Sequence, residues 1–220
     1  MSHPSSLSPH RTQMAPLEST QKYATALEIE AALKEAARSN PGKWIDHSQY
    51  VGLACRNIAA RCADLNSEKA FSLGALHDIG RYVGIVRGRH QIEGYRYCMK
   101  KGWSANARVC LTHSQVLKDI SRSLDYWDIT DEEYDHFKEF IATSEFDDYD
   151  LLVQLADCLA LANGFCILEK RMIDVARRYG TDQDSVARWN RLFELKDYFN
   201  QKTNCNIYTL LPGIEKNTLI

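Results

Sequence analysis

The sequence is poor in the features that mark several common protein classes. Its 220 residues carry a net charge of only −2, so no basic surface is expected for a nucleic-acid polymer or an anionic membrane. No apolar run is long enough to span a bilayer, and the chain does not begin with the hydrophobic region of a signal peptide. Alternating strand-like stretches with turn signals are also lacking. These absences predict a soluble, cytoplasmic, helical protein with neither a nucleic-acid polymer nor a membrane as its partner.

The seven cysteines do not form the patterns expected of disulfides or zinc sites. No C-x-x-C pair occurs, and most cysteines lie in apolar helical stretches such as VGLACRNIAARCADL and LADCLALANGFCIL. A disulfide framework is unexpected in a chain of this size and spacing, and sulfur-ligated zinc needs clustered thiols. The cysteines are therefore predicted to be buried free thiols that pack as small hydrophobic residues.

A helical period dominates the chain from about residue 19. Residues 1–18 are rich in Ser, Pro and His, and we expect them to form a flexible tail. Helical patterns cover 19–40, 43–63, 66–77, 90–101, 104–117, 131–143, 148–163, 167–179 and 182–203. Gly102, Gly164 and Gly180 fall where helix C-terminal caps are expected. The length suits one core, so residues 19–220 are predicted to form a single all-α domain.

Several polar residues fall on apolar helix faces. His47, His77 and His113 each stand at helical spacing from apolar residues, and Asp157 lies in the otherwise apolar helix YDLLVQLADCLALANG. One inward histidine is more often a hydrogen-bonded core residue than a ligand. An acid on an apolar stripe, however, is costly unless a positive group compensates it. Together these residues predict a shared cation, and imidazole with carboxylate suits Mn, Fe, Co, Ni or Zn.

The segment SLGALHDIGR, preceded by a helix with an inward histidine and followed by LVQLADCLA, resembles the HD superfamily of metal-dependent phosphohydrolases, in its HDIG form. The resemblance covers about residues 43–165. It implies an all-α helical bundle with the metal site at its centre and extra helices at the C-terminal side. It also implies four metal ligands: His47, His77, Asp78 and Asp157.

Two further histidines extend the resemblance. His90 and His113 fall where binuclear members of the superfamily place extra ligands, and Asp78 would then bridge two metals. The expected cofactor is therefore one or two divalent ions, which could be Fe, Mn, Co, Ni, Zn or Mg. The branch that cleaves cyclic di-GMP has a Gly-Tyr-Pro motif and usually a His-His pair, whereas here Ser114 follows His113 and no Gly-Tyr-Pro occurs. That difference argues against a cyclic dinucleotide substrate.

The resemblance implies hydrolysis of a phosphomonoester, phosphodiester or nucleotide-like substrate by metal-activated water. Asp78 and Arg81 are the predicted catalytic residues. Arg81, Arg87 and Arg89 are the predicted contacts to substrate phosphate, because arginine makes bidentate contacts to this group. The segment RYVGIVRGRH is expected to form a lip over the site. For Arg87 and Arg89, a solvated loop that balances nearby acids is an equally good interpretation.

Motifs for other chemistry are absent. The sequence has no G-x-x-x-x-G-K-[ST], no G-x-G-x-x-G after a strand, no G-x-S-x-G and no H-E-x-x-H, which weakens ATPase, dehydrogenase and acyl-hydrolase interpretations. No general acid or base stands out among Asp46, Glu93 and Lys100.

Two other functions stay open at this point. One is a mixed-valence di-iron oxygenase of the same superfamily, and the other is a non-catalytic metal- or nucleotide-binding signalling module. All ligand positions are filled, which favours an enzyme over a decayed binding module. The helices after residue 165 carry Arg171, Arg177 and Arg178. They are expected to cap the site, to supply substrate contacts or to form a homodimer surface; the pattern does not choose among these, and packing is the default. The expected partner is a small phosphorylated molecule or nucleotide.

Overall fold

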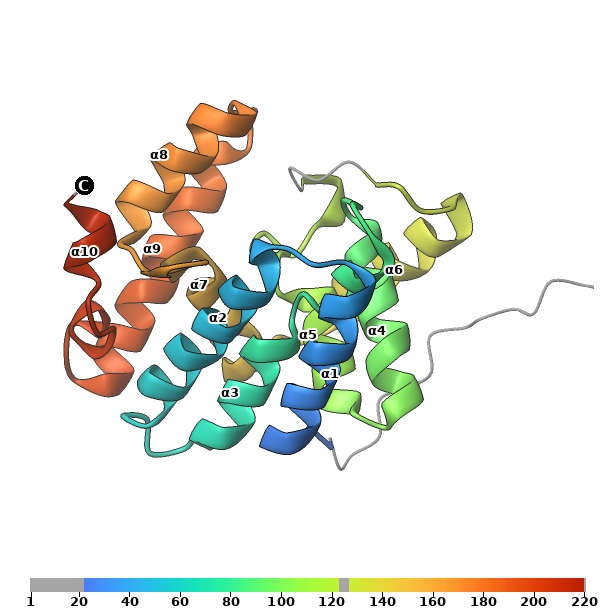
Figure 1. Cartoon of the computed structure of the whole chain (residues 1–220). Coiled ribbons are helices and arrows are strands. Elements are labelled where there is room, and N and C mark those ends of the chain that lie inside the picture. The colour runs from blue at the N-terminus through green and yellow to red at the C-terminus, as the bar shows by residue number, and fades with distance from the viewer. Residues whose placement is uncertain (1–21, 123–126, 220) are drawn as a thin grey trace, which may run out of the picture.

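The computed structural model describes residues 22–122 and 127–219 and consists mainly of α-helices (Figure 1). The α-helices are α1 Ala26–Ser39, α2 Lys43–Ala59, α3 Ser67–Leu76, α4 Arg89–Lys101, α5 Ser104–Thr112, α6 Asp131–Thr143, α7 Asp148–Leu159, α8 Leu168–Tyr179, α9 Ser185–Thr203 and α10 Glu215–Thr218. Three 3-10 helices, η1 Ile79–Val83, η2 Ile120–Arg122 and η3 Ile207–Leu210, join them, together with a hairpin of β1 Ala160–Leu161 and β2 Gly164–Phe165. The predicted all-α, HD-type bundle is confirmed.

The helices lie close to their predicted positions, and the differences concern their ends. The helix predicted to reach residue 163 ends at Leu159, because the chain turns there into the β1–β2 hairpin. Gly164, with φ +137°, belongs to that hairpin, so its predicted role as a helix cap is wrong. Gly102 and Gly180 do follow the last turns of α4 and α8. The helix predicted to reach residue 117 ends at Thr112, so α5 is shorter than expected.

Two hydrophobic clusters form the core, and α3 and α5 belong to both. The first cluster joins α2, α3, α5, α7, α8 and α9, and it includes Leu73 of α3 and Val109 of α5. The second joins α1, α3, η1, α4, α5 and α6, and it includes Leu76 of α3 and Leu111 of α5. All four of these side chains are buried, as expected for helices that are apolar on two faces. The C-terminal ends of α3 and α5 therefore lie where the two clusters meet.

A buried ion pair fixes α5 against α7. Asp150 of α7 is fully buried; it is the third residue of a capping box whose N-cap is Asp147. Its carboxylate accepts hydrogen bonds from Arg108 Nη2 at 2.7 Å and from Thr112 Oγ1 at 2.6 Å. Because both of its oxygens have donors, the charge is compensated in the interior. The contact sets the register between the helices that carry His113 and Asp157.

The α8–α9 hairpin is attached to the rest of the chain at its outer end, shown in orange in Figure 1. Arg188 of α9 is 9% exposed, and its Nη1 donates to the carbonyl oxygen of Arg122 at 2.6 Å. Arg122 in turn forms an ion pair with Asp184 at 2.6 Å. On the inner side, Leu168 and Met172 of α8 are buried in the first cluster. These contacts fix α8 relative to α7, which carries Asp157.

All seven cysteines are free, and five of them are buried, in agreement with the sequence interpretation. Within residues 22–122 and 127–219, no helix has both the length and the apolar character needed to cross a membrane. The tail expected over residues 1–18 lies outside the described residues.

Candidate metal centre and cavity

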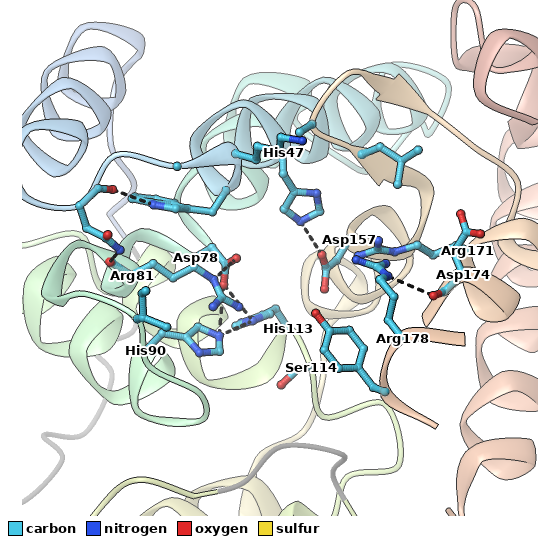
Figure 2. A pocket seen from close by; sticks show the side chains of 18 of the residues that line it. His47, Asp78, Arg81, His90, His113, Ser114, Asp157, Arg171, Asp174 and Arg178 are labelled. Atoms are coloured by element: carbon cyan, nitrogen blue, oxygen red, sulfur yellow. Dashed lines mark hydrogen bonds and ion pairs between the residues drawn. The ribbon is translucent and has the colours of Figure 1, made fainter. Parts of the chain in front are cut away.

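The six predicted ligands come together from the ends of five α-helices and one 3-10 helix. His77 and His113 are the C-cap residues of α3 and α5, and Asp78 is the N-cap residue of η1. The other three are His47 in the second turn of α2, His90 in the first turn of α4 and Asp157 in the last turn of α7. Figure 2 shows five of these side chains around one cavity. Helix termini thus deliver all six groups to the place where the two core clusters meet.

The first ligand group lies between α2, α3 and α7. The ligand atoms of His47, His77 and Asp78 lie within 4.8 Å of one another. His47 Nε2 is 2.8 Å from Asp157 Oδ1, and His77 Nε2 is 3.6 Å from the same oxygen. His77 Nε2 is also 3.8 Å from Asp78 Oδ2. Two imidazoles and two carboxylates therefore surround a single point.

The second ligand group uses Asp78 again, with His90 and His113, and its ligand atoms also lie within 4.8 Å of one another. Asp78 Oδ1 is 3.1 Å from His90 Nε2 and 3.8 Å from His113 Nε2. The two Nε2 atoms are 3.4 Å apart. Asp78 is shared by the two groups and is the one residue of the six placed to bridge two ions.

Main-chain carbonyls orient three of the imidazoles. His77 Nδ1 lies 2.7 Å from the Gly74 carbonyl oxygen, and His113 Nδ1 lies 3.0 Å from that of Cys110. His90 Nδ1 makes the same kind of contact with the carbonyl oxygen of Arg87. Since a carbonyl only accepts, Nδ1 must carry the proton in each of these bonds, so in the neutral imidazole Nε2 keeps its lone pair for a metal. This is the arrangement that metal-binding histidines need.

Two atoms of the cluster are buried without a hydrogen-bond partner among the described residues: His77 Nε2 and Asp78 Oδ1. Leaving such polar atoms unsatisfied in the interior costs about 1–3 kcal/mol each. A cation between the two ligand groups would satisfy both atoms at once. The donor set of imidazole nitrogen and carboxylate oxygen is also one that divalent transition metals accept. The residues present therefore fit a metal.

The electrostatics keep both carboxylate ligands and His113 in metal-binding protonation states. Burial opposes charge on His77, but the neighbouring Asp78 and Asp157 carboxylates outweigh it and raise the pKa of this imidazole. Burial alone would raise the pKa of Asp78, but Arg81 and His77 outweigh it and hold that pKa well below its usual range. Burial would also raise the pKa of Asp157, but the hydrogen bond with His47 and the nearby His77 imidazole outweigh it, and the pKa of this carboxyl is also well below its usual range. Burial, reinforced by His77, lowers the pKa of His113 to about 3. Both carboxylates are thus ionised and His113 is neutral near pH 7, as ligands must be.

Five of the six candidate ligands, all except His77, line a cavity of about 1070 Å³. Its wall also contains five basic side chains: Lys43, Arg81, Arg171, Arg177 and Arg178. Its acidic side chains are the ligands Asp78 and Asp157, together with Asp174. When the two carboxylate ligands are neutralised by cations, the cavity is strongly positive and suits an anionic ligand.

Arg81 is held on the shared ligand. Its Nε donates to Asp78 Oδ2 at 2.5 Å, and Figure 2 shows its side chain beside that carboxylate. The side chain is 33% exposed and lines the cavity. Arg81 therefore orients the Asp78 carboxylate and also contributes positive charge to the cavity wall.

The structure does not bring Arg87 and Arg89 into the cavity wall, although the sequence interpretation placed substrate contacts there. Their main-chain N–H groups bond to the Asp128 carboxylate, at 3.1 and 2.7 Å, and the Arg89 guanidinium lies 4.0 Å from Glu133. The segment that contains Arg87 and Arg89 therefore turns toward the loop before α6. Its early part, Gly84 and Ile85, does line the cavity. None of the proton-transfer candidates Asp46, Glu93 and Lys100 lines it.

The sequence alone did not predict which basic side chains line the cavity, and most of them come from α8. Arg171, Arg177 and Arg178 of α8 face the cavity together with Asp174, and Lys43 contributes from the start of α2. The spacing of residues 171, 174 and 178 places them on one helix face, a signal that was available in the sequence. The direction of that face depends on how α8 packs, which the spacing does not reveal.

Comparison with known families gives one match. Residues 17–118 match the HDOD domain, which is related to the HD superfamily. The matched region is a little less than half of the chain, and it contains every predicted ligand except Asp157. No curated protein and no solved structure matches the chain. Over residues 17–118 the chain is similar to an HD-related domain, and its His/Asp clusters could hold a metal.

Proposed function

We propose that this protein is a metal-dependent phosphohydrolase of the HDIG type, acting on a small phosphorylated molecule. One observation carries the proposal: Asp78 belongs to two ligand groups, and its Oδ1 is buried without a hydrogen-bond partner among the described residues. An aspartate in that position is costly in a protein that holds no cation. The basic wall of the cavity supports an anionic substrate.

In this proposal the chain holds two divalent ions. His47, His77, Asp78 and Asp157 would bind one ion, and Asp78, His90 and His113 would bind the other. When bound, such ions lower the pKa of a coordinated water and polarise a phosphoryl oxygen. Arg81 holds the shared carboxylate in place and contributes positive charge where the phosphate would lie.

The HDOD match gives specific support to a second candidate, a signalling module without catalytic activity. Domains of this kind are often non-catalytic. A module of that kind has no need for a full ligand set, whereas in this chain all six side chains converge and three imidazoles are oriented by main-chain carbonyls. The phosphohydrolase therefore remains the better account. The oxygenase of the same superfamily would use the same ligands, so the bound metal distinguishes it.

The test begins with metal content. The full-length protein is purified without chelator and assayed by elemental analysis beside two variants, Asp78→Ala and Asp197→Ala. Asp197 is an exposed aspartate on α9 that pairs with Lys196 and lies outside the cavity, so it controls for loss of a carboxylate. We expect up to two divalent ions per chain in the wild type and in Asp197→Ala, and none or one in Asp78→Ala.

Activity on a panel of phosphomonoesters, phosphodiesters and nucleotides follows, with Mn²⁺, Co²⁺, Ni²⁺ or Mg²⁺ supplied. We expect turnover by the wild type and by Asp197→Ala, and a loss of at least about a hundredfold in Asp78→Ala, because the metal-bound water is lost with its ligand. Two redox-active irons per chain without phosphatase activity would favour the oxygenase. Equal metal binding by wild type and Asp78→Ala would refute the site, and tight metal binding without turnover would favour the signalling module.

A further inference from the structure

Helix α8 presents a basic face to the cavity. Arg171, Asp174 and Arg178 stand at positions i, i+3 and i+7, so they share one side of the helix, and all three line the cavity. The other side of α8 buries Leu168 and Met172 in the first core cluster. Packing therefore fixes the direction of the basic face.

Arg171 and Arg178 form no ion pair with a carboxylate within the described ranges. The acid between them is engaged elsewhere, since Asp174 Oδ2 lies 3.8 Å from Lys170 Nζ. Arg178 Nε donates to the main-chain carbonyl of Asp174 at 3.0 Å, and the guanidinium carbon lies 5.4 Å from the ring centroid of Tyr179. Uncompensated arginines along a cavity wall are suited to bind an anion.

The basic face lies on the opposite side of the ligand cluster from Arg81. Figure 2 shows Arg171 and Arg178 on the Asp157 side, whereas Arg81 lies beside Asp78. The seven-residue step from Arg171 to Arg178 extends the face over about 10 Å of helix axis, which is longer than a single phosphate group. A phosphate at the metal ligands, with Arg81 beside it, leaves this second set of charges unused.

The geometry points to a second anion-binding subsite formed by Arg171 and Arg178, and hence to a substrate with two separate phosphate groups. This inference rests on the proposed phosphohydrolase function and names its substrate class, a small organic bisphosphate. One phosphate lies at the metal ligands, where hydrolysis takes place. The other is bound by α8, which selects the substrate and determines which phosphate reaches the metal site.

The test compares two ligands that differ by one phosphate, fructose 6-phosphate and fructose 1,6-bisphosphate. Their affinities are measured by calorimetry with Mn²⁺ supplied, for the wild type, an Arg171→Gln/Arg178→Gln double variant and Arg191→Gln. Arg191 lies on α9, pairs with Glu194 and is outside the cavity, so it controls for the lost charge. Thermal unfolding verifies that each variant is folded.

We expect the wild type and Arg191→Gln to bind the bisphosphate at least about tenfold more tightly than the monophosphate, as charge-assisted hydrogen bonds to the second phosphate require. In the double variant this ratio should fall to about one, with monophosphate affinity changed by less than about threefold. A wild-type ratio near one, or a ratio that the double variant leaves unchanged, overturns the subsite.

The variant Asp78→Ala separates this result from the proposed function. If the wild type and Asp78→Ala bind metal equally and the wild type hydrolyses no phosphoester, but bisphosphate binding is still lost on replacing Arg171 and Arg178, the subsite is supported and the hydrolase is not. If the monophosphate binds in a metal-dependent way without any preference for the bisphosphate, the hydrolase stands and the subsite fails.

Discussion

Gly80, the last residue of the His-Asp-Ile-Gly segment, lies where η1 touches the backbone of α4. A Cβ atom at this position would be 1.9 Å from the His90 carbonyl oxygen and 2.3 Å from the Gly94 nitrogen. Both neighbours are main-chain atoms, so no side-chain rotation can relieve the overlap. Gly80→Ala must therefore push α4 away from η1, and with it the ligand His90.

The cost follows from that overlap. Overpacking in a well-packed interior costs about 1–3 kcal/mol and more when backbone must move, so we expect a loss of about 3 kcal/mol in the free energy of unfolding. For a chain of this length, that corresponds to a decrease in Tm of about 6–12 °C. In the proposed two-ion site, the ion bound by Asp78, His90 and His113 should be lost as well, whereas an ion on the His47 and Asp157 side should be retained.

The assay is thermal unfolding followed by circular dichroism, together with metal analysis of the same samples. Gly102→Ala is the matched control, because Gly102 follows α4 with a φ of +77°, and a Cβ added there would meet no described atom within 4 Å. This control should cost about 1 kcal/mol for the left-handed conformation alone and leave metal content unchanged. A Gly80→Ala protein with wild-type Tm and wild-type metal content would show that the contact between η1 and α4 does not hold His90.

Three further predictions concern charge and metal. Replacing the fully buried Asp150 with Ala leaves Arg108 without its carboxylate partner. We expect the free energy of unfolding, measured in urea, to fall by about 3 kcal/mol or more. A decrease below about 1 kcal/mol would contradict this account of the α5–α7 contact. Despite burial, the Thr130 N–H and Arg96 hold the pKa of Glu133 below its usual value, so its contribution to stability is complete above its unfolded pKa and is lost as pH falls through the folded one. Glu133→Gln should therefore lower Tm by a few degrees at about pH 6 and by less near pH 3, and an equal decrease at both values would refute the assignment. Removing metal with a chelator should lower the wild-type Tm, since an ion at about a hundred times its Kd adds about 2.7 kcal/mol, and should lower the Tm of Asp78→Ala by less; an equal shift in both proteins would count against the site.

Much of the fold was predictable because its helices are long, periodic and clearly capped. The end of α7 was not, because Ala160 to Phe165 is apolar enough to continue a helix, and the β1–β2 pairing that replaces it depends on contacts made outside this segment. The local sequence pattern indicates helix propensity, whereas tertiary packing determines where a short apolar run leaves the helical conformation.

The candidate site was also predictable only in part. His47, His77 and Asp157 could be named because a polar residue on an apolar stripe needs a partner, and the structure brings all of them to one point. The substrate contacts could not be assigned, because nearness in sequence suggested Arg87 and Arg89, whereas the cavity is lined by arginines from α8, far along the chain from the His-Asp pair. Which helix face closes a cavity is a property of long-range packing.

The attachment of the α8–α9 hairpin has a kinetic consequence. Leu168 and Met172 anchor one end of the hairpin in the core, and the buried Arg188 with the Arg122–Asp184 ion pair anchors the other. A wall held at both ends stays in place, so in the proposed phosphohydrolase a substrate would exchange by diffusion through the open side of the cavity, whose lining includes the fully exposed Ile85. Turnover would then depend on the chemical step or on product dissociation, without the microsecond-to-millisecond gating that a closing segment imposes.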